Sequence, residues 1–441
     1  MSFTIDKQTQ EDLNLLGKFK KNSIINLFNR TRTRKGELLL ERMFLLPLTD
    51  PDEINKRSSI IQYFQRVNTE FPLPPALYGD VISYLESSSG SRLGTITGTI
   101  YRKISFLAIG DNGYEIVCKG ILSLIEMLGI VKEFVNKIDE PDSPFRKQLD
   151  EIKGLFDKKL TERLEKPVRS NLSFFSTLYY DSLFRYTYRR QLDRLIQVMS
   201  EIDVYISVAD VAREKKLNYA TASHRETHST RVEGLFHPSL PSPVPNSISI
   251  DRDKNVIFLT GANMAGKSTF MKSYGIAVYL AHMGFPVPAT EMTFSVLEGM
   301  YTSINLPDNL SLGYSHFYAE VLRVKQAANE VGMPKDMLVI FDELFKGTNV
   351  KDAFDATVAV TQAFGKWDNS QFIISTHIVE AGEMLRDNNN MQFLYLPTRL
   401  DHNMPVYTYK LEQGISGDRH GMRIIHNERI VETIVKNAGT E

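Results

Sequence analysis

The sequence of 441 residues has little cysteine and no excess of charge of either sign. Its single cysteine, Cys118, cannot form an intramolecular disulfide, and it excludes zinc or iron–sulfur sites built from several cysteines. Lysine and arginine number 52 against 53 aspartates and glutamates, so the formal charge is −1. Charge alone therefore neither requires nor excludes a polyanionic partner.

Long apolar runs are also missing. Residues 1–7 contain no apolar signal core of ~7–15 residues, and no later stretch offers the ~20 apolar residues that cross a bilayer. The longest uncharged run, residues 273–290, is interrupted by His282, Pro286 and Pro288. We expect a cytoplasmic protein that has no contact with a membrane.

The remaining composition is that of a globular protein, with 42% apolar and 24% charged residues. At ~100–200 residues per domain, the length predicts two to four domains. A stretch rich in proline and serine, residues 237–245, cannot be helical and is typical of chain that joins domains. We therefore predict domains at residues 1–235 and 236–441, with formal charges of +4 and −5.

The first predicted domain reads as mainly helical. From Leu192, apolar residues recur in steps of three and four and so share one helix face; they are Leu195, Met199, Ile202, Ile206 and Ala209. Residues 181–216 contain no glycine or proline, which predicts one helix of roughly 50 Å that could act as a lever. Two shorter packed helices are the alternative, because periodicity does not exclude a kink.

The second predicted domain alternates apolar runs with helical stretches. Residues 256–259, 338–341 and 372–375 are continuous apolar runs, as expected for parallel strands that are covered on both faces. Residues 391–396 and 406–411 are weaker strand candidates. The whole chain is therefore expected to be α + α/β, with a doubly wound domain in its second part.

A phosphate-binding motif follows the first of these strands. Residues 261–268 match G-x-x-x-x-G-K-[ST] between a predicted strand and a predicted helix. In this motif the glycines let backbone amides face phosphate, the lysine binds the β- and γ-phosphates, and the serine hydroxyl binds Mg²⁺. The predicted nucleotide-binding residues are Gly261, Ala262, Asn263, Met264, Ala265, Gly266, Lys267, Ser268 and Thr269.

The other two predicted strands end in polar residues that suit ATP hydrolysis. Asp342 is expected to bind Mg²⁺ together with Ser268, and Glu343 is a candidate general base for the attacking water. His377 follows the third strand, where an imidazole could reach the γ-phosphate. Each signal alone also fits a solvated strand end, but their combination with the loop favours an ATPase.

These motifs resemble the MutS mismatch-repair family. Residues 259–269 are similar to its phosphate loop, in which Asn-Met between the glycines is distinctive, and residues 342–349 and 375–377 are similar to its acidic strand end and switch histidine. The resemblance implies a helical core and lever domain followed by a P-loop, ABC-type α/β ATPase domain. It also implies ATP and Mg²⁺ as cofactors, with Lys267, Glu343 and His377 as catalytic residues.

Residues 308–317 resemble the signature segment of the same family. There, the equivalent of Ser315 approaches the ATP bound by the other subunit, which implies a homodimer through the ATPase domains. Residues 27–48 resemble the start of the family's helical core. Because this similarity begins close to Met1, we expect no mismatch-recognition domain. We also expect only an abbreviated clamp, because about 100 residues separate the early core from the predicted long helix. Ala265 and His316 stand where the family usually has glycine and threonine.

The resemblance implies DNA binding, for which the sequence offers two basic clusters. Arg30, Arg32, Arg34 and Lys35 could contact phosphates or form a solvated turn, and Arg185, Arg189 and Arg190 lie among aromatic residues that could equally pack inside the protein. The alternative function is an ATP-switched protein-interaction module without DNA. A protein partner could supply recognition or a downstream activity, and adenine is expected to pack near residues 244–246 by position.

Overall fold

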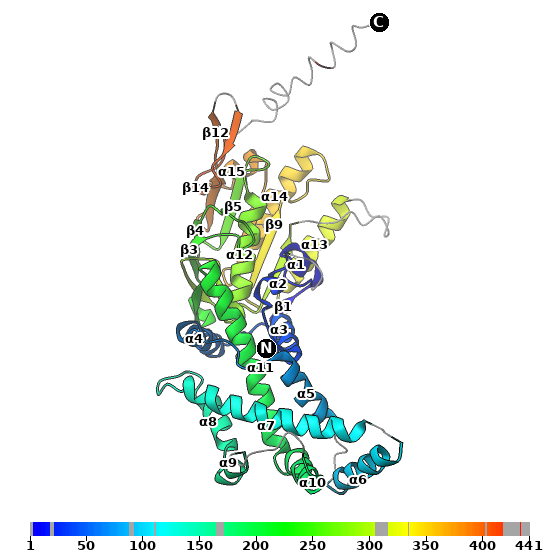
Figure 1. The fold of residues 1–441 in the computed structure, drawn as a ribbon. Coiled ribbons are helices and arrows are strands. Elements are labelled where there is room, and N and C mark those ends of the chain that lie inside the picture. The colour runs from blue at the N-terminus through cyan, green and yellow to red at the C-terminus, as the bar shows by residue number, and fades with distance from the viewer. Residues whose placement is uncertain are drawn as a thin grey trace. The chain divides into compact units, whose positions relative to one another are not determined.

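The computed structural model describes residues 3–17, 22–87, 92–109, 112–164, 172–304, 316–333, 335–401, 404–417 and 433. The chain forms two compact units, and Figure 1 labels many of their elements. Unit 1 comprises residues 1–27, 44–58 and 214–441, and unit 2 comprises residues 28–43 and 59–213. The division at residue 235 stays a prediction of functional domains; the compact units divide the chain differently, because two N-terminal segments pack with the C-terminal part.

Unit 1 is built on a mostly parallel sheet of seven strands, in the order β1-β8-β9-β10-β5-β11-β14. All neighbours pair in parallel except β11 and β14. The three apolar runs expected to be buried parallel strands are its central strands β5, β9 and β10, which confirms that prediction. The strands are β1 (Thr4–Ile5), β5 (Val256–Gly261), β8 (Gly299–Ser303), β9 (Met337–Asp342), β10 (Gln371–Ser375), β11 (Met391–Leu396) and β14 (Glu412–Gln413).

The two weaker strand candidates have different outcomes. Residues 391–396 form β11 with the expected bounds. Of residues 406–411, only Val406 and Tyr407 lie in a strand, β13 (Met404–Tyr407), and that strand is not part of the large sheet. β12 (Thr398–Asp401) and β13 form a separate antiparallel hairpin, and β14 joins the edge of the large sheet beyond them.

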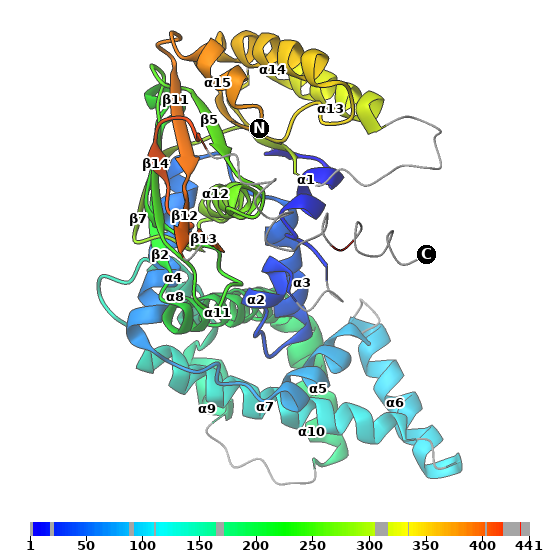
Figure 2. The ribbon, with the colours of Figure 1, turned by 90° about the horizontal axis from the view of Figure 1, so that it is seen from above.

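Helices cover both faces of the seven-stranded sheet (Figure 2). On one face, alternate strand residues such as Phe258, Val339 and Ile374 share a buried core with α13 (His316–Val331), α14 (Val350–Gly365) and α15 (Val379–Leu385). On the other face lies α12 (Lys267–His282), whose Tyr274 hydroxyl donates to Gln371 of β10 at 3.0 Å. The helix α12 is buried along most of its length, because a second sheet covers its other side.

That second sheet has five strands in the order β4-β3-β7-β2-β6. Its first two strands in the chain, β2 and β3, fall in the region that is expected from the sequence to be mainly helical. The strands are β2 (Asn218–Ser223), β3 (Thr230–Leu235), β4 (Asn246–Ile250), β6 (Pro286–Val287) and β7 (Glu291–Ser295), and a 3₁₀ turn, Arg225–Thr227, separates β2 from β3. The proline-rich stretch 237–245 connects β3 to β4, which pair with each other, so it lies within unit 1.

The N-terminal segment belongs to unit 1 because polar contacts fix it to the large sheet. The Asp12 carboxylate accepts from the Thr302 hydroxyl at 2.7 Å and from the Ile304 backbone amide at 2.9 Å. Arg323 of α13 forms an ion pair with Asp6 and lies over the ring of Tyr301. The two short helices of this segment are α1 (Lys7–Asp12) and α2 (Ile24–Phe28).

Unit 2 is helical, as expected. Its core includes the contacting rings of Phe64, Phe145 and Tyr205, and α7 buries one face along its length. The unit boundaries fall inside α2, α3, α4 and α11. The helices are α3 (Arg34–Leu45), α4 (Pro51–Val67), α5 (Pro75–Glu86), α6 (Arg92–Ile109), α7 (Gly113–Lys137), α8 (Arg146–Leu155), α9 (Lys158–Leu164), α10 (Phe174–Ser182) and α11 (Arg189–Lys215).

One helix, α11, covers most of the stretch 181–216, so the prediction of a single long helix is confirmed for residues 189–215, and the helix begins later than predicted. α10 ends at Ser182, a π-helical turn spans Leu183–Thr187, and α11 runs from Arg189 to Lys215. At the π turn, the buried Arg185 pairs with Asp181 and donates to the Tyr84 carbonyl at 2.7 Å. These buried polar groups explain an irregularity that apolar periodicity could not reveal. The apolar face predicted from Leu192 to Ala209 is confirmed, because all of its residues are buried.

The expected fold class, helical plus α/β, is therefore confirmed. Within the described ranges, no helix is both long enough and apolar enough for a membrane crossing.

Candidate functional site

The phosphate-loop motif lies where three parallel strands of unit 1 end. Residues 262–266 connect β5 to α12, and β10 lies between β5 and β9 in the sheet. Ser375 at the end of β10 is in register with Leu259 on one side and with Asp342 on the other. Parallel strands present their carboxyl ends at one edge, so the loop, the acidic strand end and the segment before His377 meet there.

Both glycines of the motif are required by the backbone. Gly261 has φ +146° and Gly266 has φ +103°, conformations that favour glycine. A Cβ atom at Gly261 would lie 3.2 Å from the Leu396 carbonyl oxygen, and one at Gly266 would lie 3.1 Å from the Tyr409 ring. The loop can therefore approach a ligand closely, and α12 presents its N-terminal amides directly after it.

The ammonium of Lys267 is held against this loop. It donates to the carbonyl oxygens of Gly261 at 2.9 Å and Ala262 at 3.3 Å, and it lies 4.0 Å from a carboxylate oxygen of Glu343. Burial lowers the pKa of Lys267, while the negative charges of Glu343 and Asp342 oppose that shift. A lysine so placed is a cation in a partly desolvated site, where it attracts phosphate more strongly than it would in water.

Two serine hydroxyls hold the carboxylate of Asp342. Ser268 donates to one carboxylate oxygen, and Ser375 donates to the other at 2.5 Å. Hydroxyl and carboxylate oxygens are the protein ligands that Mg²⁺ prefers, so this pair fits the ion. In the described part of the chain, His, Cys, Asp and Glu form no group of three that could hold a metal alone. A bound Mg²⁺ would need further oxygens from phosphate or water, as is usual at nucleotide sites.

Glu343 and His377 follow the neighbouring strands. Glu343 has φ +55°, and its backbone amide donates to the Ser375 carbonyl oxygen at 3.1 Å. Its side chain is a quarter exposed and lines a cavity beside the loop. His377 is exposed two residues beyond the end of β10. The structure thus brings Lys267, Ser268, Asp342 and Glu343 together, and the role of each stays a prediction.

The remaining predicted site residues divide into two sets. Ala262, Asn263, Met264 and Thr269 line the same cavity, while the side chain of Ala265, within the loop, is buried. Ser315 and most of the segment 308–317 lie outside the described residues.

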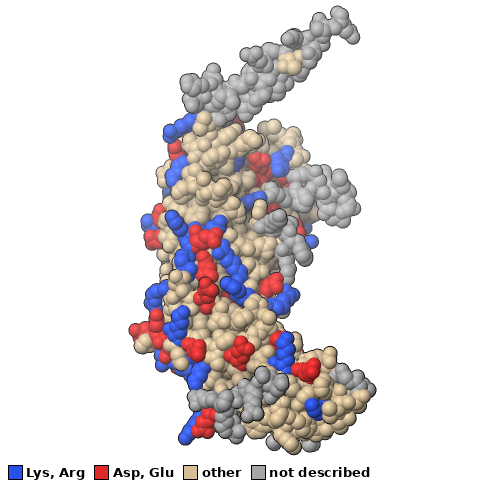
Figure 3. Space-filling view, viewed as in Figure 1, with Lys and Arg blue, Asp and Glu red and all other residues tan. Residues whose placement is uncertain are grey.

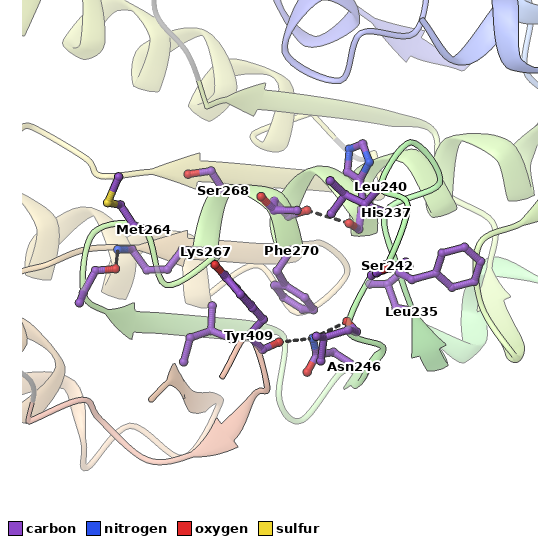
Figure 4. A pocket seen from close by; sticks show the side chains of 18 of the residues that line it. Leu235, His237, Leu240, Ser242, Asn246, Met264, Lys267, Ser268, Phe270 and Tyr409 are labelled. Carbon is purple, nitrogen blue, oxygen red and sulfur yellow. Dashed lines mark hydrogen bonds between the residues drawn. The ribbon is translucent and has the colours of Figure 1, made fainter. Parts of the chain in front are cut away.

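The cavity beside the loop has a volume of about 620 Å³ (Figure 4). One wall is the stretch between β3 and β4, including His237, Leu240 and Val244, and Tyr409 stands on another side. Burial lowers the pKa of His237, and the charge of Lys272 adds to that effect. Val244 and Asn246, from the region expected to bind the base, line this cavity. Tyr409 lines it as well, although the sequence does not predict this. Neither composition nor periodicity marks a tyrosine so far along the chain from the loop.

The two basic clusters of unit 2 differ in exposure. Arg30, Arg32 and Arg34 are exposed, although Arg34 pairs with Glu37. Arg185 is buried, so the packing alternative is correct for that residue. Its neighbour Arg189 donates to the Leu85 carbonyl and, at 2.9 Å, to Asp193. On the face drawn in Figure 3, basic and acidic side chains are interspersed.

Comparisons with known proteins agree with these motifs in both units. The family model of MutS domain V matches residues 257–441, and the family model of MutS domain III matches residues 8–209. The DNA mismatch repair protein MutS of Listeria monocytogenes serotype 4a (strain HCC23) is 27% identical over 257 residues, which cover 57% of this chain and 29% of that protein. The protein of the same name from Staphylococcus haemolyticus (strain JCSC1435) is 25% identical over 258 residues, which again cover 57% of this chain and 29% of that protein.

A third relative aligns with the whole chain. The DNA mismatch repair protein MutS of Leuconostoc mesenteroides subsp. mesenteroides (strain ATCC 8293) is 22% identical over 541 aligned residues, which cover 100% of this chain and 62% of that protein. The chain thus spans less than two thirds of the length of these relatives. Two family models that together match most of the sequence, and an alignment over its full length, show that the chain belongs to the MutS family.

Proposed function

We propose that this chain is an ATP hydrolase whose nucleotide site is the cavity of unit 1, in a P-loop, ABC-type ATPase domain. The observation that carries the proposal is the meeting of Lys267, Ser268 and Asp342 at the ends of β5 and β9. This arrangement places a cation, a hydroxyl and a carboxylate around one loop whose glycines permit close approach of phosphate.

The residues would divide the work of hydrolysis. Lys267 stabilises the charge that develops on the phosphates, because it lies in a site of low dielectric. Ser268 and Asp342 would hold Mg²⁺, which when bound neutralises phosphate charge. Glu343 lines the cavity and is assigned to orient the attacking water and accept its proton. His377, together with Ser315 of the partner in a homodimer, is assigned to sense the γ-phosphate.

The apolar end of the cavity suits the adenine base. Val244 and Tyr409 line it from segments far apart in the sequence, and both side chains are partly exposed to it. An aromatic ring and an aliphatic side chain that line the same end of a cavity can hold a flat base by stacking and dispersion.

The relatives are named for DNA mismatch repair, and we extend that role to this chain as part of the proposal. ATP binding would join two copies through their ATPase domains and change the position of the helical levers on DNA. The side chains of Arg30, Arg32 and Arg34 are exposed at the surface, where phosphate contacts could form, although Arg34 also pairs with Glu37. Recognition of a particular DNA structure could come from a partner protein in the cytoplasm.

One observation favours the second candidate, an ATP-switched protein-interaction module. The helix α6 exposes Ile100, Tyr101, Ile104 and Leu107, which share one side of the helix and form a face that suits protein contact better than DNA contact. Arg185 of the second basic cluster is bonded to groups inside the protein, so its charge does not contribute to a DNA-binding surface.

The ATPase rate with and without duplex, mismatched and branched DNA tests the main proposal. Stimulation by any of them supports a DNA-dependent ATPase, and hydrolysis that ignores all of them favours the second candidate. Filter binding over a salt series separates the two further, since contacts to several phosphates give a steeply negative slope of log affinity against log salt. The absence of Mg²⁺-dependent ATP turnover under all conditions would refute the assignment as an ATPase.

A further inference from the structure

We propose that Ser375 is a positioning residue for the metal-binding carboxylate of Asp342 and thereby sets the affinity of the nucleotide site for Mg²⁺. This inference rests on the proposed ATPase function, and it concerns a residue that the phosphate-loop motif does not contain. Ser375 is the last residue of β10, the strand between the loop strand β5 and the acidic strand β9.

The contacts of Ser375 make it a bridge between the two acidic residues. Its hydroxyl donates to one oxygen of the Asp342 carboxylate at 2.5 Å. The same hydroxyl oxygen accepts from the backbone amide of Glu343 at 3.3 Å, and the Ser375 carbonyl accepts from that amide at 3.1 Å. One side chain therefore fixes the carboxylate of Asp342 and helps to fix the backbone that carries Glu343.

The direction of these bonds matters for a metal ion. Asp342 has two carboxylate oxygens; Ser375 occupies one, and the other faces the hydroxyl of Ser268. The Ser375 contact thus turns a defined oxygen toward the position where Mg²⁺ would be shared between Ser268 and Asp342. Without the Ser375 hydroxyl, the carboxylate can rotate, and the oxygen that Ser375 contacts loses its donor in a partly buried place.

Burial ensures that water cannot easily replace this hydroxyl. Ser375 has 0% exposure. Hydrogen bonds that involve a charged partner contribute about 1.5–3 kcal/mol, which corresponds to roughly 10- to 100-fold in an equilibrium constant. We expect the lower end of that range for Mg²⁺, because the carboxylate also keeps its contact with Ser268.

The residue just before the same strand offers a matched control. Ser370 precedes β10 and is also buried, and its hydroxyl also connects this strand to the β9 side of the sheet. It accepts from the Met337 amide at 3.2 Å and donates to the Lys335 carbonyl at 3.4 Å, at the opposite end of the strands from the site. The change Ser370→Ala removes an equally buried hydroxyl between the same strands without touching Asp342.

The experiment measures binding of a fluorescent ADP analogue to the full chain at increasing Mg²⁺, and in EDTA. For Ser375→Ala we expect the Mg²⁺ concentration at half-saturation to rise about tenfold, with affinity in EDTA unchanged. Ser370→Ala should leave the Mg²⁺ dependence at the wild-type value, although both variants lose some thermal stability. Ser375→Cys, which is slightly larger but keeps a weak donor at the same position, should give a smaller rise.

The outcomes distinguish this inference from the proposed function. Wild-type protein that binds no nucleotide, either with Mg²⁺ or in EDTA, refutes the nucleotide site itself. Wild-type protein that binds nucleotide equally well in both overturns the inference about Mg²⁺ and leaves the site standing. If wild-type binding depends on Mg²⁺ but Ser375→Ala responds as Ser370→Ala does, the positioning role is overturned and the site stands. Should Ser375→Ala fail to fold, Ser375→Cys decides: an unchanged Mg²⁺ dependence in that variant also overturns the inference.

Discussion

The side-chain amide of Asn246 donates to the backbone carbonyl of Tyr409 at 2.9 Å, which joins two segments on either side of the nucleotide cavity (Figure 4). The carbonyl oxygen of the same amide accepts from Leu411 at 2.8 Å, and its nitrogen also reaches the Val244 carbonyl at 3.3 Å. The side chain of Asn246 is therefore occupied by backbone groups. It fixes the distance between Val244 and Tyr409, the two side chains proposed to enclose the base.

We expect Asn246→Ala to weaken nucleotide binding by roughly fivefold to tenfold, because ~1–1.5 kcal/mol of hydrogen bonding between the two walls is lost. Turnover at saturating ATP should change little, since no group near the phosphates is altered. The affinity for a fluorescent ADP analogue measures this effect.

Asn255→Ala is the control for that change. Asn255 is also buried and also donates to backbone carbonyls, including that of Trp367 at 2.8 Å, but it lies at the start of β5, away from the cavity. Equal losses of nucleotide affinity in both variants would mean that Asn246 acts only through general stability.

Gly36 is expected to tolerate no larger residue without a loss of stability. A Cβ atom there would lie 2.4 Å from a carboxylate oxygen of Asp203. Asp203 in turn accepts from the backbone amides of Arg32 at 2.9 Å and Thr33 at 2.8 Å, so it cannot move freely. Gly36→Ala should lower the free energy of unfolding by about 1–3 kcal/mol through overpacking.

Gly79→Ala provides the matched comparison, because a Cβ atom at this helical position meets nothing within 4 Å. It should raise the free energy of unfolding by ~0.5–1 kcal/mol. Urea denaturation followed by far-ultraviolet circular dichroism measures both changes. A Gly36→Ala protein as stable as Gly79→Ala would show that the Asp203 contact is easily relaxed.

His282 is expected to remain neutral in the folded protein down to acidic pH. Burial lowers its pKa to about 4, although the hydrogen bond to Leu48 opposes the shift. Its Nε2 accepts from the Leu297 amide at 3.2 Å, so a proton on that nitrogen would face another N–H group. The unfolded chain binds this proton near pH 6.5, and stability is therefore lost as pH falls from 6.5 toward 4.

Histidine-selective NMR checks this directly. One imidazole resonance, identified by its absence in His282→Gln, should stay constant between pH 8 and 5. The pH dependence of the unfolding free energy over the same range should be weaker in His282→Gln than in the wild type. An imidazole that titrates near pH 6.5 in the folded protein contradicts the buried hydrogen-bond arrangement.

The centre of unit 1 could be predicted from the sequence because β5, β9 and β10 are buried on both faces, which leaves continuous apolar runs. Prediction was weaker where long-range polar contacts decide the structure. The attachment of residues 1–27 to the large sheet depends on pairs such as Arg323 with Asp6, and the π turn before α11 depends on Arg185. Neither pair has a local signature in the chain.

The site, too, contains residues that could be predicted from the sequence and residues that could not. The residues of the phosphate loop could be named in advance because their backbone conformation and spacing are fixed by phosphate binding. Tyr409 could not, since it reaches the cavity from a distant segment, and Ser375 has the sequence context of an ordinary strand residue. The proline-rich stretch 237–245 has the composition of a linker, and composition does not distinguish a linker from the cavity wall that it forms.

The measurement that tests the central claim most directly compares ATP binding with ATP turnover in the wild type, Glu343→Gln and Lys267→Ala. We predict that Glu343→Gln binds ATP with nearly wild-type affinity while its turnover falls by about 10²–10⁴-fold, because general-base catalysis is lost. Lys267→Ala should lose turnover and also bind ATP more weakly. Undiminished turnover in both variants would contradict the assignment of this cavity as the site of ATP hydrolysis.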